Sequence, residues 1–277
     1  MEIEYLKSIL IRHNCGYVPI KNEHSLLKIY ELFKNETMFF PQHDYGIECF
    51  YIALFYYFKK DLINTEKYYL DAIKHGQVDA MHCYADLLSK YNKFENAEKY
   101  YKMAINHGYI HAINNLAALY SNKKDFVNAE KYYKLAIEKG LIISMYNLAG
   151  LYVKKGDLTS AKNYLLMFEE NITSTDPENL EKLGNTMIHL ATVYEIERDN
   201  LQAQRYYLKA MEYGNIDAVR LLISLYLRLK DFDNAEKFLK MLADKDDEDA
   251  ILFLIEFYNN KGDTVNANLY QQMVKEH

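Results

Sequence analysis

Hydrophobic residues recur along most of the chain at the spacing of amphipathic helices. Leu116, Ala117 and Tyr120 lie one and four residues apart, which puts them on one face of a helix. The next segment carries its own stripe, formed by Ala129, Tyr132, Tyr133, Ala136 and Ile137. Large Tyr side chains alternate with small Ala in this second stripe, so neighbouring helices can approach closely at the Ala positions. The pattern predicts pairs of short helices joined by short turns.

The helix pair recurs at a fixed interval. "AEKYYKLAIEKG" at 129–140 nearly repeats "AEKYYKMAINHG" at 97–108. The small residue that opens this segment is found at Thr65, Ala97, Ala129, Ala161, Ala203, Ala235 and Ala267. The interval is 32 residues throughout, except for 42 residues where about ten are inserted near 171–180. One helix pair cannot bury its stripe alone, so the sequence predicts an all-α fold, an α/α superhelical solenoid of about seven 32-residue repeats.

The turns carry matching signals. An Asp stands before the second helix of six repeats, at Asp61, Asp125, Asp157, Asp199, Asp231 and Asp263, and Lys93 replaces it in the second repeat. Asp at this position caps free backbone N–H groups at a helix start. Between repeats stands a glycine, at Gly76, Gly108, Gly140 and Gly214. Glycine readily adopts the left-handed conformation that ends a helix.

Charged residues occupy the face of the second helix opposite the apolar stripe. Three Glu–Lys pairs four residues apart recur there, at Glu98–Lys102, Glu130–Lys134 and Glu236–Lys240. Each pair should stabilise its helix by about 0.2–0.5 kcal/mol. We interpret this face as solvated.

The ends and the insertion divide the chain further. Residues 1–44 contain two helix-like segments and are predicted to form an N-terminal helical cap, followed by the repeat solenoid over 45–277. Within the insertion, Asp176 and Pro177 are typical of a helix start, which favours a lengthened first helix in the fifth repeat. A tolerated surface loop is the alternative.

The repeated residues resemble two related families. Leu116, Ala117, Tyr120 and the second-helix stripe are similar to the tetratricopeptide pattern at its own spacings. "KLAIEKGLIISMYNLAGLY" at 134–152 resembles the Sel-one-like repeat, although the loop within each repeat has tetratricopeptide length. The final repeat departs from the pattern, with Gln271 and Val274 where Tyr and Ala are expected. The resemblance spans 47–277 and implies a superhelix that binds other proteins as a scaffold or adaptor.

Charge and composition narrow the classes of partner. The net charge of −6 gives no long-range attraction for nucleic acid or anionic lipid. Three widely spaced Cys form neither a disulfide framework nor a metal motif. The N-terminus carries charges within its apolar run, and no stretch is long enough to span a membrane. We therefore expect a cytoplasmic protein that binds neither membrane nor nucleic acid.

Motifs for catalysis are not found. The sequence has no phosphate-binding glycine loop, no nucleophile elbow and no Cys pair. His107 and His111 have metal-ligand spacing, but Gly108 separates them at a predicted helix junction and a third ligand is not evident. We expect no catalytic residue, no metal and no cofactor, and hence no enzyme.

The resemblance also implies where a partner binds. In tetratricopeptide superhelices the first helix of each repeat lines the concave groove. Mapping that face gives a site rich in Asn, namely Asn114, Asn115, Tyr146 and Asn147, with His82, His111 and Asn122 nearby. Asn amides donate and accept together, so they can pair with the backbone of an extended peptide from a partner protein. The alternative is that these are ordinary solvated polar residues.

Two other functional classes stay open at this stage. Helical repeats can read RNA one base per repeat, although the acidic balance argues against it. The chain could also target an enzyme carried on another chain. A chaperone C-terminus is disfavoured, because the carboxylate clamp of some tetratricopeptide domains uses Lys and Asn where this chain has His82 and Asp86.

Overall fold

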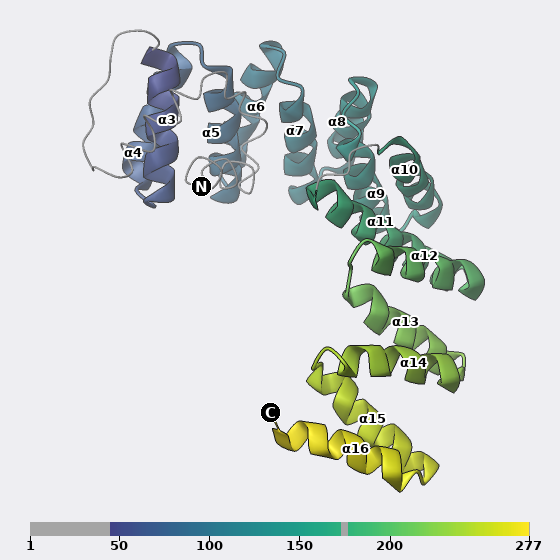
Figure 1. The fold of residues 1–277 in the computed structure, drawn as a ribbon. Helices are drawn as coiled ribbons and strands as arrows, with labels where there is room; N and C mark the ends of the chain where they lie inside the picture. Colours follow the sequence, from purple (N-terminus) through teal and green to yellow (C-terminus); the bar gives the residue numbers. More distant parts are fainter. Residues whose placement is uncertain (1–44, 173–176, 277) are drawn as a thin grey trace. The chain divides into compact units, whose positions relative to one another are not determined.

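The computed structural model describes residues 45–172 and 177–276, and every regular element in these ranges is an α-helix (Figure 1). The predicted N-terminal helical cap, residues 1–44, lies outside the described residues. Fourteen helices, α3 to α16, follow one another over the described ranges. The prediction of an all-α solenoid of helix pairs is thus confirmed.

The chain divides into two compact units, with the boundary after Lys155. The first unit contains α3 (Tyr45–Phe58), α4 (Leu62–Lys74), α5 (Val78–Lys90), α6 (Phe94–Asn106), α7 (His111–Asn122), α8 (Phe126–Glu138) and α9 (Ile143–Lys155). The second contains α10 (Leu158–Asn171), α11 (Pro177–Ile196), α12 (Asn200–Glu212), α13 (Asp217–Arg228), α14 (Phe232–Ala243), α15 (Glu248–Lys261) and α16 (Thr264–Glu276). Within each unit every helix packs on the next one along the chain.

The alanine positions of the repeat are fully buried in this packing. Ala97, Ala129, Ala161, Ala203 and Ala235 have no exposed surface. Beside them, second-helix tyrosines such as Tyr133 and Tyr207 are buried against the first helix. The alternation of large and small side chains in the sequence therefore corresponds to the core of each unit.

Both predicted turn signals are confirmed. Each of the six Asp residues accepts a hydrogen bond from the backbone N–H three residues later, as Asp125 does from Asn128 at 3.1 Å. Gly108 and its equivalents adopt the left-handed conformation, with φ of +83° at Gly108. The turn inside each repeat uses the same conformation, with glycine in two repeats, Gly156 and Gly262, and other residues in the remaining five: Lys60, Asn92, Lys124, Arg198 and Lys230 have φ between 58° and 62°.

The insertion lengthens a helix. α11 begins at Pro177 and has 20 residues, whereas the other first helices have 12 to 14. Where earlier repeats end on a left-handed glycine, Ile172 instead adopts an extended conformation, with φ −79° and ψ 116°. The lengthened-helix interpretation of 171–180 is the one that the structure shows.

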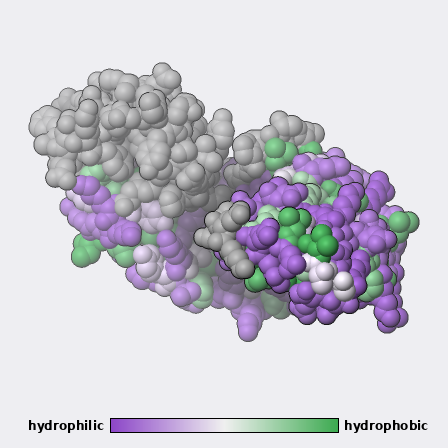
Figure 2. Space-filling view, turned by 60° about the horizontal axis from the view of Figure 1, so that its bottom comes forward, coloured by the Kyte–Doolittle hydropathy of each residue, from purple (hydrophilic) through white to green (hydrophobic). Residues whose placement is uncertain are grey.

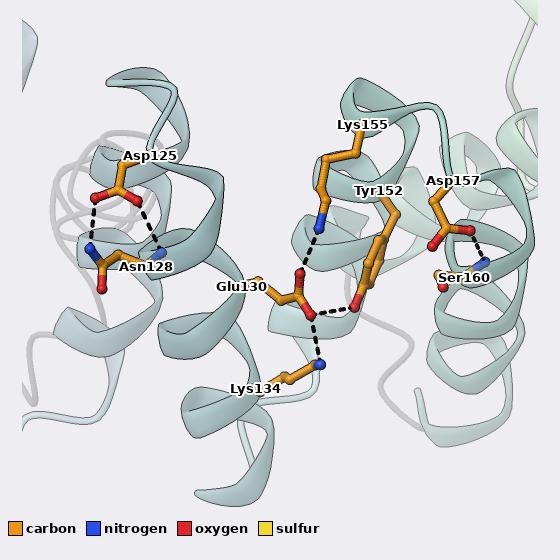
Figure 3. A network of polar contacts seen from close by, with 8 residues as sticks. All are labelled: Asp125, Asn128, Glu130, Lys134, Tyr152, Lys155, Asp157 and Ser160. Carbon is orange, nitrogen blue, oxygen red and sulfur yellow. Dashed lines mark hydrogen bonds and ion pairs between the residues drawn. The ribbon is translucent and has the colours of Figure 1, made fainter.

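The Glu–Lys pairs also connect successive repeats, which the sequence interpretation did not include (Figure 3). Glu130 accepts hydrogen bonds from Lys134 of its own helix at 2.7 Å, and from Tyr152 and Lys155 of α9 at 2.9 and 2.7 Å. The ammonium of Lys134, then that of Lys155, lowers the pKa of Glu130 to about 2. Glu236 has the same surroundings in the second unit, with Lys240, Tyr258 and Lys261. This face is therefore a contact between repeats as well as a solvated surface.

Candidate partner-binding surface

The first helices α5, α7 and α9 carry the residues predicted to bind a partner. Asn114 and Asn115 of α7 occupy the same repeat positions as Tyr146 and Asn147 of α9, 32 residues later. All four side chains are half-buried. Because α7 packs near both α5 and α9, equivalent positions come together in the first unit.

Hydrogen bonds join these positions into a continuous row, here called the asparagine ladder, made of Asp86, Asn115, Asn114, Asn147 and Ser144. Asn115 Nδ2 donates to Asp86 Oδ1 at 3.0 Å. Asn114 Nδ2 donates to Asn115 Oδ1 at 3.2 Å. Asn147 Nδ2 and Ser144 Oγ both donate to Asn114 Oδ1 at 2.9 Å. The ladder therefore connects three successive first helices.

The ladder leaves part of its hydrogen-bonding capacity unused. A primary amide can donate twice and accept twice. Within the ladder Asn114 donates once, Asn115 donates once and accepts once, and Asn147 only donates. Each of these three amides therefore keeps at least one group for another partner while its orientation is held by its neighbours.

The other predicted residues do not join the ladder directly. His82 is 1% exposed, and its Nε2 lies 3.5 Å from Asp86 Oδ2. Burial lowers the pKa of His82, and Asp86 only partly offsets this. His111, at the start of α7, lies with its ring 5.8 Å from that of Tyr109, and Asn122 is exposed at the end of the same helix. A surface ligand would therefore meet the ladder amides rather than His82.

The equivalent positions in the second unit have a different chemistry. Leu221 and Phe253 stand where Asn115 stands in α7, and Leu252 stands where Asn114 stands. Arg220 donates to Asp247 at 2.6 Å, and Arg228 pairs with Glu195, so both arginines of α13 are held in ion pairs. A cavity of 310 Å³ lies next to Phe253. The sequence analysis missed this cavity.

No group of three or more His, Cys, Asp or Glu side chains among the described residues could hold a metal ion. None of the described helices is both long and apolar enough to cross a membrane. The ladder consists of amides, a hydroxyl and one carboxylate, and these can bind a polar ligand by hydrogen bonds.

A comparison with family models finds one match, to the tetratricopeptide repeat, over residues 110–138 and 143–166. A comparison with curated proteins finds no matching sequence.

Similar solved structures include one described as the functional characterization of Pseudomonas aeruginosa pilF, with TM-score 0.56 and 15% identity, covering 83% of this chain and 97% of that one. A tetratricopeptide repeat protein from Parabacteroides merdae has TM-score 0.54 and 13% identity, with 84% and 93% covered. Human IFIT1 with PPP-AAAA has TM-score 0.56 and 17% identity, with 91% and 57% covered. At these identities the likeness concerns the fold. The fold and the matched repeats together make this chain a tetratricopeptide-like helical repeat.

Proposed function

We propose that the protein is a non-catalytic scaffold or adaptor that holds an extended peptide segment of a partner protein on the first-helix face of its first unit. The asparagine ladder carries this proposal. Its amides, on the first helices α7 and α9, are held in place by one another and by Asp86 of α5, and they keep unused donors and acceptors on both helices. An extended peptide presents backbone N–H and C=O groups in alternation, so it can pair with such a row whatever its side chains.

The unit that carries the ladder offers no strong charge to select a ligand. Residues 1–155 contain 20 basic and 17 acidic side chains, and the ladder itself includes one carboxylate. Nucleic-acid binding depends largely on neutralising phosphates with Lys and Arg, and an amide-rich surface supplies little of this. The structure of human IFIT1 contains PPP-AAAA, and IFIT1 shares the fold of this chain at 17% identity. A shared fold at this identity does not show that the two proteins bind the same ligand. A peptide is therefore the better-supported ligand.

The test begins with identification of the partner by proximity labelling in the native cell, followed by a binding measurement with the purified proteins. Asn115 and Asn147 are then changed together to Ala. Loss of one hydrogen bond at each position should weaken binding by about 1–3 kcal/mol in total. The matched control changes Asn106 and Asn163 to Ala, because both are exposed on second helices away from the ladder. Equal binding by both double variants, with unchanged circular dichroism melts, would place the site on another surface.

A further inference from the structure

The first-helix face changes character from α7 to α15. The positions that hold Asn114 and Asn115 in α7 hold Leu252 and Phe253 in α15. Leu252 is 55% exposed and Phe253 38% exposed. Most of the surface visible in Figure 2 is hydrophilic, with hydrophobic side chains gathered in small clusters. The face that is polar in the first unit thus carries two exposed apolar side chains in α15, and one of them, Phe253, lines a cavity.

A cavity of 310 Å³ accompanies this change, here called the α13–α15 pocket. It is lined by Leu227, Phe232, Phe253, Glu256, Phe257, Asn260 and Lys261. The rings of Phe232 and Phe257 lie 6.3 Å apart, and Phe232 is 46% exposed. A dry cavity of about 150 Å³ already accommodates a benzene-sized group, so this pocket has room for one large apolar side chain and part of its neighbour.

One wall of the pocket is fixed by contacts of its own. Lys261 Nζ lies 4.2 Å from the centre of the Phe257 ring and 3.2 Å from Glu236 Oε2. The lysine charge is thus partly offset by Glu236, which also pairs with Lys240, and it lies close to the ring. Its methylene stem covers apolar surface, and its charge does not define the rim.

One acidic side chain lies at the rim, and a second, Asp249, lies near the pocket without lining it. Glu256 lines the pocket, is exposed and has no ion-pair partner among the described residues. Asp249, also exposed, lies four residues before Phe253 and therefore on the same face of α15. Residues 156–277 as a whole contain 22 acidic and 13 basic side chains. Both the local and the unit-wide charge favour a basic partner.

We infer that the α13–α15 pocket binds a basic, amphipathic segment of a partner protein. One large apolar side chain of that segment, Leu, Met or Phe, enters the pocket between Phe232 and Phe253. A Lys or Arg within about one helical turn of it faces Glu256 and Asp249. The inference rests on the proposed scaffold function and names the chemistry of a partner segment, but it uses a surface of the second unit and none of the ladder residues.

The test uses peptides displayed on phage. A random 12-residue library is selected on the full chain and counter-selected on the uncoated support, and the enriched peptides are synthesised with fluorescein for anisotropy titrations. We expect enriched sequences to combine one or two large apolar residues with Lys or Arg. Phe253→Ser should weaken their binding about ten- to hundredfold, since it removes an apolar contact. Val265→Ser is the matched control, because Val265 is 78% exposed and does not line the pocket.

The charge is tested separately. Glu256→Lys should weaken binding about three- to tenfold, with a loss that shrinks at high salt, whereas Glu248→Lys should have little effect because Glu248 does not line the pocket. Enrichment of acidic or wholly polar peptides, or equal binding to the Phe253→Ser and Val265→Ser variants, would overturn the inference. The inference would also be overturned if no peptide bound and the chain self-associated in sedimentation experiments in a way that Phe253→Ser abolished. In that case the pocket would be occupied by a second copy of this chain.

The outcomes separate this inference from the proposed function. A partner peptide that loses affinity in the Asn115→Ala, Asn147→Ala variant but not in Phe253→Ser would support the ladder and overturn the pocket. The reverse result would support the pocket and count against the ladder. Unchanged melting temperatures for both variants are required, and the exposure of Phe253 makes this expected.

Discussion

The second repeat contains the one capping position in the described helices that departs from Asp in the intra-repeat turn, and this departure allows a sharp test. Lys93 precedes α6 and makes no side-chain capping bond. Its backbone nevertheless has the capping geometry, with φ −84° and ψ 62° against −83° and 75° at Asp125. The local sequence "KFEN" at 93–96 also matches "DFDN" at 231–234 in its last residue. We predict that Lys93→Asp stabilises the protein.

The expected gain follows from the capped repeats. Asp231 Oδ1 accepts the backbone N–H of Asn234 at 3.2 Å, and its Oδ2 accepts the Asn234 side-chain amide at 2.7 Å. Asn96 stands at the same place in α6 and is exposed, so both bonds can form without repacking. A side-chain cap contributes about 1 kcal/mol. Replacing a cation by an anion at a helix N-terminus adds about 0.3–1 kcal/mol. We expect about 1.5 kcal/mol in total.

The assay is urea unfolding at pH 7 followed by circular dichroism, with Lys93→Ala as the control that removes the cation without adding an acceptor. Lys93→Asp should clearly raise the urea concentration at the midpoint of unfolding, and Lys93→Ala should raise it only slightly. The extra gain of the Asp variant should disappear as the pH falls below about 4, because the protonated carboxyl no longer accepts both bonds. A Lys93→Asp variant that unfolds with or before its Ala counterpart would refute the capping argument.

Three further outcomes follow from the geometry. Gly108→Ala should destabilise the protein by about 1 kcal/mol, because φ at this residue is +83°. Gly150→Ala should instead stabilise it by about 0.5–1 kcal/mol, because Gly150 lies in the interior of α9 with open space at its Cβ. Thermal melts of the two variants beside the parent protein test both predictions. Ala136→Leu should cost about 1–3 kcal/mol by overpacking a fully buried site, as urea titrations can measure. Glu130 and Glu236 have pKa values lowered to about 2, so their stabilisation is complete above about pH 4.5 and is lost between there and pH 2; Glu130→Gln should flatten the acid limb of a stability–pH curve.

The turns show which parts of the fold the sequence could predict. Asp and Gly report backbone conformation directly, since one accepts free N–H groups and the other tolerates positive φ, and both signals were correct. The left-handed residue inside five of the repeats was missed, because Lys60, Lys124 and Arg198 give no such signal. Helix pairing imposes this conformation on them, at a cost of about 1–2 kcal/mol that tertiary packing offsets.

The candidate site was predictable only where one residue type recurs in register. Asn114, Asn115 and Asn147 stand out in the repeat alignment, but the alignment does not show that their amides bond to one another across helices. The burial of His82 could not be inferred either, since its position varies from the buried Phe50 through the half-buried Asn114 to the exposed Leu252 in other repeats. The α13–α15 pocket was missed because the exposure of Phe232, Phe253 and Phe257 depends on what packs beside them, which the spacing of apolar residues does not show.

The contact between repeats contains a charge reversal that permits a second sharp test. Glu130 pairs with Lys155 in the first unit, and the equivalent positions of the next repeat hold Lys162 and Glu197, whose charged groups lie 2.6 Å apart. The position of Lys134 is taken there by Leu166. In the repeat where the two charges are exchanged, the cation that would repel Lys162 is therefore absent.

Variants of the first unit can introduce the side-chain types of Lys162, Leu166 and Glu197 at positions 130, 134 and 155, one step at a time. Glu130→Lys alone loses two ion pairs and places three cations together, so we expect a loss of about 1–2 kcal/mol after allowance for the partial exposure of these side chains. Adding Lys155→Glu should recover only part of the loss, because Lys134 still faces a like charge four residues away. Adding Lys134→Leu as well should restore the parent stability to within about 0.5 kcal/mol. Unfolding free energies from urea titrations at low and high salt give the comparison. If the triple variant were no more stable than the single one, the contact would depend on features other than this charge set, and the reversal at Lys162 and Glu197 would have no role in matching each repeat to its neighbour.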